Sequence, residues 1–417
     1  MKLSKNSRDL MLFFTKNKHI NTVKQTKQTN GILTELYKDI YDAYIFVNGL
    51  HREKYYTITT KKILHTSQIS RPKTFNSNSF PDIVRKHIDE VASSEITYTF
   101  SLFNRSIKLI FTLEEDNAEL KIPTFNKYVD SIVMWLYIVN QYASKQCSQT
   151  LTVYFYFTSL EKRLPVTNIS ILDEINVNTA FTRTCQPESE IVIFRFEEWL
   201  KVFFHETAHT FAIDFSDMNN YHVHKCILDI FKVKSDVNLF ESYSEFWAET
   251  MNALFCSFFS IKNKKNIQEF LVHAEFFLNF ERTYSFFQLV KTLNFMGLSY
   301  QDLYSQTQHS QVLRDNLYKE NTNVLSYYVI KTILINNYQS FLFWCKKHNF
   351  SLMQFNKTIK TQEEFCEFIK HYYKKSNMLH AVAETEQFLA HIKGNKRKPP
   401  NLHFVLSNMR MSICELG

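Results

Sequence analysis

The alternation of hydrophobic and polar residues predicts several strands in the first half of the chain. Residues 97–114 alternate with period two on both sides of a turn at Asn104, which is the pattern of two adjacent strands. Further short runs rich in β-branched and aromatic residues occupy 151–157, 177–182 and 191–195. These runs predict a mixed sheet.

Helical periodicity dominates the remaining pattern. One helix is expected at about 126–145 and another at 196–215, directly after the last predicted strand. Beyond residue 216 strand signals nearly vanish, and apolar residues recur with helical period at 224–233, 239–260, 266–296, 324–348, 362–375 and 378–393. We therefore predict an α+β fold.

Three regions follow from this division. Residues 1–80 are polar and irregular, with a loop-like stretch at 71–81, and are expected to form an N-terminal lobe or extension. Residues 81–215 should form the sheet lobe, and residues 216–417 a mainly helical lobe. A substrate groove between two such lobes is the usual arrangement.

The expected helix at 196–215 carries candidate metal chemistry. It contains His205, Glu206 and His209, and apolar residues surround them on nearly every side of the helix. Histidines four residues apart project from one helical face and can bind one zinc ion, while the adjacent glutamate can act as general base on a metal-bound water. The competing interpretation is that both histidines are hydrogen-bonded core residues and Glu206 faces solvent.

A catalytic zinc usually takes a third protein ligand, which must come from downstream. The metzincin pattern is excluded because Ala212 and Phe215 replace the glycine and histidine it requires. A later helix instead aligns Glu241, Glu245 and Glu249 on one stripe of an otherwise apolar surface. Spacing alone does not decide between Glu241 and Glu245.

The stretch His205-Glu206-x-x-His209 followed by Glu245-Phe-Trp-Ala-Glu249 resembles the gluzincins, the thermolysin-type zinc peptidases, and is locally similar to the anthrax lethal-factor type. The resemblance covers about residues 190 to 255. It implies a zincin-like fold with Glu245 as third ligand and Glu249 as an acid that orients a ligand histidine. In the alternative, Glu241 is the ligand and Glu245 orients the histidine.

The same resemblance implies an edge strand, at 177–182, that pairs with an extended substrate. An ordinary buried hairpin is the alternative for these residues. It also implies a Tyr or His that stabilises the oxyanion. Tyr243, His273 and Tyr327 are candidates that the sequence does not separate.

Composition limits the remaining possibilities. The net charge is +8, from 49 Lys and Arg against 41 Asp and Glu, and the basic residues are dispersed apart from short runs at 262–265 and 393–398. No nucleic-acid partner is expected. Seven scattered cysteines without paired spacing predict free thiols in a reducing compartment. The longest apolar stretch, 132–139, is too short for a membrane span, and no secretory signal is recognisable.

The sequence thus predicts a zinc metalloendopeptidase, cytoplasmic or inside a virion, that acts on a protein or peptide. One alternative is another zinc hydrolase, such as an amidase or esterase, because the metal ligands do not define the bond that is cleaved. The other is a catalytically silent zincin-fold structural protein of a virus particle, against which the presence of Glu206 argues.

Overall fold

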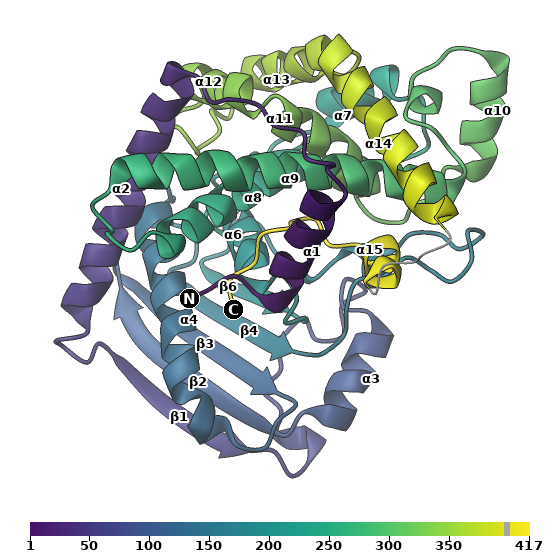
Figure 1. The fold of residues 1–417 in the computed structure, drawn as a ribbon. Coiled ribbons are helices and arrows are strands. Elements are labelled where there is room, and N and C mark those ends of the chain that lie inside the picture. The colour runs from purple at the N-terminus through teal and green to yellow at the C-terminus, as the bar shows by residue number, and fades with distance from the viewer. Residues whose placement is uncertain (396–400) are drawn as a thin grey trace.

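The computed structural model describes residues 1–395 and 401–417, in which a sheet is covered by many helices (Figure 1). The strands are β1 (Tyr56–Lys62), β2 (Ser94–Leu102), β3 (Arg105–Leu113), β4 (Thr150–Phe157), β5 (Ala180–Thr182) and β6 (Glu188–Ile193). The helices up to the candidate site are α1 (Lys5–Lys16), α2 (Lys27–Leu50), η1 (Thr66–Gln68), α3 (Asp82–Val91), α4 (Ala118–Asn140), α5 (Glu174–Val177) and α6 (Trp199–Thr210).

The later helices are α7 (Tyr221–Ile230), α8 (Leu239–Ser260), α9 (Ile267–Met296), η2 (Gln301–Leu303), α10 (Gln308–Leu317), η3 (Leu325–Ile330), α11 (Lys331–Asn336), α12 (Tyr338–His348), α13 (Ile359–Tyr372), α14 (Ser376–Gly394) and α15 (Leu402–Ser407). The predicted α+β class is confirmed, with most helices following the sheet. Among the described residues, no helix combines the length and the apolar character needed to cross a membrane.

The six strands form one open mixed sheet in the order β1-β2-β3-β4-β6-β5. β1, β2 and β3 are antiparallel, β3, β4 and β6 are parallel, and the short β5 closes the other edge antiparallel to β6. Phe103 and Asn104 both adopt positive φ between β2 and β3, as a two-residue hairpin turn requires, so the observed turn begins one residue before the predicted turn, which starts at Asn104.

Alternating side chains bury both faces of the sheet. Leu109, Phe111 and Phe155 belong to the large core under α4 and the helices, whereas Ile110 and Tyr154 belong to a smaller core on the opposite face, which α3 covers. Because both faces are covered, β3 and β4 are nearly continuous hydrophobic runs in the sequence.

Residues 1–80, expected to be irregular, contain two long helices and the edge strand β1. Leu10 and Phe14 of α1 and Leu33 and Leu36 of α2 are buried in the same large core as the helices that follow the sheet. Their helical faces were overlooked because polar Lys, Asn and Thr residues interrupt them.

The prediction that all seven cysteines are free thiols is wrong. Cys147, after α4, and Cys185, between β5 and β6, form a disulfide. The other five cysteines are free. No local spacing indicates this bond, because its two cysteines are 38 residues apart in the sequence.

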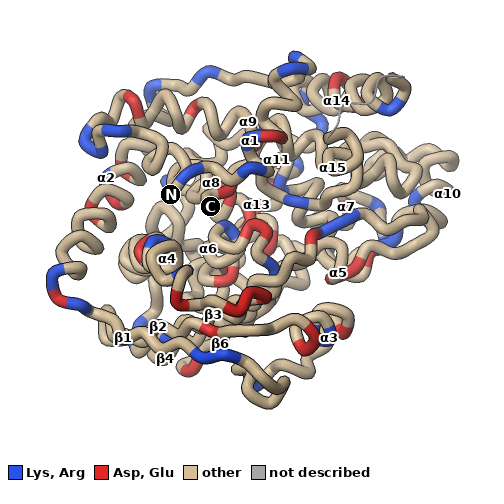
Figure 2. Tube along the Cα trace, turned by 60° about the horizontal axis from the view of Figure 1, so that its bottom comes forward, with Lys and Arg blue, Asp and Glu red and all other residues tan. Residues whose placement is uncertain are grey.

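Charged residues are spread over many elements (Figure 2). Residues 396–398 of the basic run at 393–398 lie outside the described residues.

Candidate metal centre

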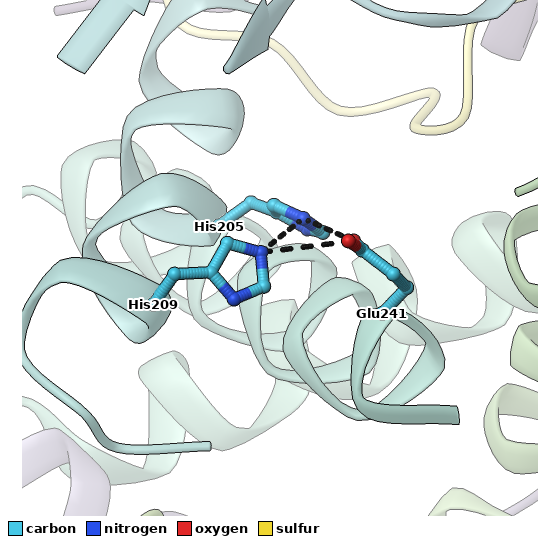
Figure 3. A group of neighbouring side chains, drawn as sticks. All are labelled: His205, His209 and Glu241. Carbon is cyan, nitrogen blue, oxygen red and sulfur yellow. Dashed lines mark hydrogen bonds and ion pairs between the residues drawn. The ribbon is translucent and has the colours of Figure 1, made fainter. Parts of the chain in front are cut away.

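Helix α6 carries the first two candidate ligands into the interior. All twelve of its residues are buried, because the helix packs between the sheet and α8. His205 and His209 lie one turn apart on the same face, as the spacing predicts. Their side chains point toward the first turn of α8, where Glu241 lies (Figure 3).

Three donor atoms converge between these helices. The Nε2 atoms of His205 and His209 are 3.1 Å apart, and Glu241 Oε2 lies 3.0 Å from the first and 3.6 Å from the second. Ligands about 2.0–2.1 Å from a tetrahedral zinc are separated by roughly 3.3 Å from one another. The three separations lie on both sides of this value, so the group has the dimensions of a three-ligand zinc site.

Each imidazole is held from behind by a buried carboxylate. Glu245 Oε2 lies 2.9 Å from Nδ1 of His205, and Asp214 Oδ2 accepts a hydrogen bond from Nδ1 of His209. A carboxylate at Nδ1 keeps the proton there and leaves the Nε2 lone pair for a metal. Both Nε2 lone pairs therefore point at the same place as the Glu241 oxygen, an arrangement that requires either a bound cation or shared protons.

Sequence reasoning missed Asp214. It is fully buried just beyond the end of α6, after Ala212 has turned the chain with a positive φ. Its carboxylate also accepts hydrogen bonds from Ser244 Oγ and from the backbone and hydroxyl of Ser216. The available signal was one acid within the apolar run that follows His209, at a point where nothing else explains a charge.

Glu245 and Glu249 lie deeper along α8 and pair with buried lysines. Lys201 Nζ lies 2.6 Å from Glu245 Oε1, and Lys331 Nζ lies 2.7 Å from Glu249 Oε1. Glu245 thus joins Lys201 to His205, whereas no contact joins Glu249 to a ligand histidine in the described structure. The carboxylate that the structure brings to both Nε2 atoms is Glu241.

The electrostatics favour charge separation within this cluster. Burial lowers the pKa of His205, but hydrogen bonds to Glu241 and Glu245 outweigh it and raise that pKa to about 9. Burial also disfavours ionised Glu241, yet the two imidazoles hold its pKa well below the usual range. Without a metal, an ionised Glu241 therefore faces imidazoles that tend to be protonated. A divalent cation bound at this place would displace the protons from their Nε2 atoms.

Glu206 differs from its neighbours because it has no partner. It is 7% exposed, and no hydrogen bond or ion pair joins it to another described residue. Burial raises the pKa of Glu206, and attraction to His205 and His209 offsets only part of that rise. It lines the cleft in front of the three donors, where a raised pKa suits an acid–base group.

Of the three candidates for oxyanion stabilisation, only Tyr327 lies at the cluster. Its hydroxyl donates a 2.8 Å hydrogen bond to Glu241 Oε2, and it belongs to the π-helical turn η3. Tyr243 is buried behind the site and donates to the Met353 carbonyl at 2.8 Å. His273 lies on α9 against Phe277 and does not line the cleft.

A cleft of about 570 Å³ opens onto the cluster. The edge strand β5 and residues 320–323 form its walls, and a 3.0 Å hydrogen bond from Thr322 to Asn178 joins these walls at one end. Of the predicted strand at 177–182, only residues 180–182 pair as a strand, because Val177 ends α5 and residues 178–179 connect the two elements.

Neither the models of known protein families, nor the curated proteins, nor the solved structures compared with this chain gave a match.

Proposed function

We propose that this chain is a zinc-dependent metalloendopeptidase of gluzincin type, with a zincin-like arrangement of the sheet and α6. The observation that carries the proposal is the convergence of three donors in front of an unpaired, buried Glu206. Two imidazoles and one carboxylate are the donor set of a catalytic zinc site with one open position.

The proposed ligands are His205, His209 and Glu241. Glu241 takes the place that the resemblance gave to Glu245, because only its carboxylate reaches both Nε2 atoms. Glu245 then orients His205, which is the role the resemblance gave to Glu249. When bound, zinc would lower the pKa of a water molecule toward ~7 and polarise the substrate carbonyl.

The protein groups supply the proton transfers. Glu206 accepts a proton from the attacking water and returns it to the leaving amine, and its raised pKa makes it a better base than an exposed glutamate. Tyr327 already donates a hydrogen bond beside the site and is the group placed to stabilise the oxyanion.

The sheet edge supports a peptide as substrate. Phe194 N–H donates to the Thr179 carbonyl at 2.9 Å, and β5 pairs Phe181 with Val192. Because hydrogen-bonded pairs alternate in antiparallel ladders, the backbone groups of Ala180 and Thr182 face away from β6. Both residues line the cleft, where an extended peptide could pair with them. An ester or small amide would not use this edge.

The cleft also favours basic side chains in that peptide. Besides Glu206 and the three donors, its acidic lining residues are Glu174, Asp236 and Glu320, and no described Lys or Arg lines it. Burial raises the pKa of Glu320 to about 7, so Glu174 and Asp236 supply most of the added negative charge. Glu174 and Asp236 have no ion pair with another described residue. On a chain of net charge +8, this acidic cleft favours substrates that carry Lys or Arg.

The test is cleavage of a mixed-sequence peptide library, followed by mass spectrometry, with and without a chelator. We expect chelator-sensitive cleavage near basic residues, and Glu206→Gln should retain zinc but lose cleavage. Glu53→Gln, at an exposed glutamate that does not line the cleft, serves as the control that retains cleavage. Cleavage by the Glu206→Gln variant would refute the assigned role, and zinc binding without any cleavage would favour the silent structural protein.

A further inference from the structure

The cysteines that remain free are not scattered in space. Cys226 on α7 and Cys366 on α13 line one cavity and their thiols interact, and Cys256 on α8 interacts with Cys414. With the Cys147–Cys185 disulfide, six of the seven cysteines are arranged in pairs, and only Cys345 is left over. Nearly every cysteine of the chain therefore has another cysteine as a neighbour.

The two remaining pairs differ in access to solvent. Cys256 and Cys414 are both buried in the core, where a soluble oxidant does not reach them. Cys226 is partly exposed, and together with the 3% exposed Cys366 it lines a cavity of about 320 Å³ between α7 and α13. An oxidant can therefore enter this cavity and meet Cys226 first.

The two helices are already held in register at this point. Gln362 of α13 donates hydrogen bonds to the Asn219 carbonyl at 3.3 Å and to Asn220 Oδ1 at 3.0 Å, just before α7 begins. Cys366 lies one turn further along α13, and Cys226 lies six residues after Asn220, within α7. A bond between their sulfurs would link surfaces that are already packed together.

We propose that Cys226 and Cys366 form a reversible disulfide that links α7 to α13. Cys226 is the attacking thiol, since it is the exposed partner. The hydrogen bond from the Cys366 thiol lowers the pKa of Cys226 and so favours its thiolate. This site does not depend on the proposed peptidase activity.

The oxidant is a small disulfide such as oxidised glutathione. The Cys226 thiolate attacks one of its sulfurs, and one glutathione thiolate leaves. Cys366 then loses its proton and attacks the Cys226 sulfur, which expels the second glutathione. Overall, two protein thiols are oxidised to one disulfide, and the oxidant is reduced to two thiols.

The experiment uses the folded, full-length chain with oxidised glutathione, followed by denaturation, thiol alkylation and peptide mapping. Of seven cysteines, two are bonded in the structure, so five thiols are expected before treatment and three afterwards. The new cross-link should join Cys226 to Cys366, and dithiothreitol should restore the thiols. Cys345 and the Cys256–Cys414 pair are internal controls that should stay reduced.

Two variants separate the steps. Cys226→Ser should retain all four of its remaining free thiols, and Cys366→Ser should trap glutathione on Cys226 as a mixed disulfide. The proposal is overturned if five thiols persist in the treated wild-type chain, or if the cross-link maps to any other pair.

Discussion

Replacement of Asp214 by asparagine tests the support behind the candidate metal centre. The side chain keeps its size, but the negative charge and one acceptor oxygen are lost. In the structure both oxygens only accept: Oδ2 from His209 Nδ1 and from Ser244 at 3.0 Å, and Oδ1 from the Ser216 backbone at 3.2 Å and its hydroxyl at 2.8 Å. Whichever way the amide turns, its NH₂ group faces donors.

The expected effect is large for a residue that does not touch the metal. Loss of a group that orients a ligand histidine typically costs about 10- to 100-fold in metal affinity, or roughly 1.4–2.8 kcal/mol. We expect the upper part of this range because Asp214 is fully buried and solvent does not screen its charge. The mismatched amide should also lower the free energy of unfolding by about 1–3 kcal/mol.

The assay is a zinc titration in competition with a chromophoric chelator, at fixed pH and ionic strength. Asp217→Asn is the matched control, because that carboxylate is more exposed and pairs with Lys357 at 2.6 Å, away from the cluster. The variant at 217 should bind zinc like the wild type. If Asp214→Asn also binds zinc with unchanged affinity, His209 does not depend on this carboxylate and the reasoning fails.

Three further predictions concern the same cluster. Glu245→Gln leaves the buried Lys201 without its partner and should cost about 3–5 kcal/mol of stability, measured by urea denaturation; a loss under 1 kcal/mol would contradict it. Tyr327→Phe should retain zinc and reduce kcat by about 10²-fold, and an unchanged kcat would exclude it as the oxyanion donor. Because the pKa of His205 is raised from 6.5 to about 9, its charged form stabilises the metal-free fold fully below pH 6.5, and this contribution is lost as the pH rises to about 9. Zinc affinity should correspondingly increase up to about pH 9, and a plateau from pH 7 would contradict the raised pKa.

The sequence was most informative where one local rule decides the structure. Helix α8 begins and ends at the predicted residues 239 and 260, because its apolar pattern is long and uninterrupted. The i, i+4 rule likewise placed His205 and His209 on one face of α6. The N-terminal helices α1 and α2 escaped notice because tertiary packing, and not a clean local pattern, stabilises them.

The choice between Glu241 and Glu245 needed the structure. Both lie on one stripe of α8, so helical geometry alone gives them the same direction. The two residues differ in their surroundings. The first turn of α8, which carries Glu241, lies beside the Nε2 atoms, whereas Glu245 forms an ion pair with Lys201. The contact of Lys201 with Glu245 also joins two helices and has no local signal, whereas Asp214 lies only five residues after its partner His209.

The proposed peptidase requires that His205, His209 and Glu241 bind one zinc ion together. X-ray absorption at the zinc edge, on the zinc-loaded wild-type chain and the Glu241→Gln variant, tests it most directly. We predict one zinc per wild-type chain with two imidazole nitrogens and oxygen ligands at ~2.0–2.2 Å and no sulfur, and weakened binding in the variant. A sulfur-containing shell, no bound zinc, or an unaltered site in the Glu241→Gln variant would contradict the account.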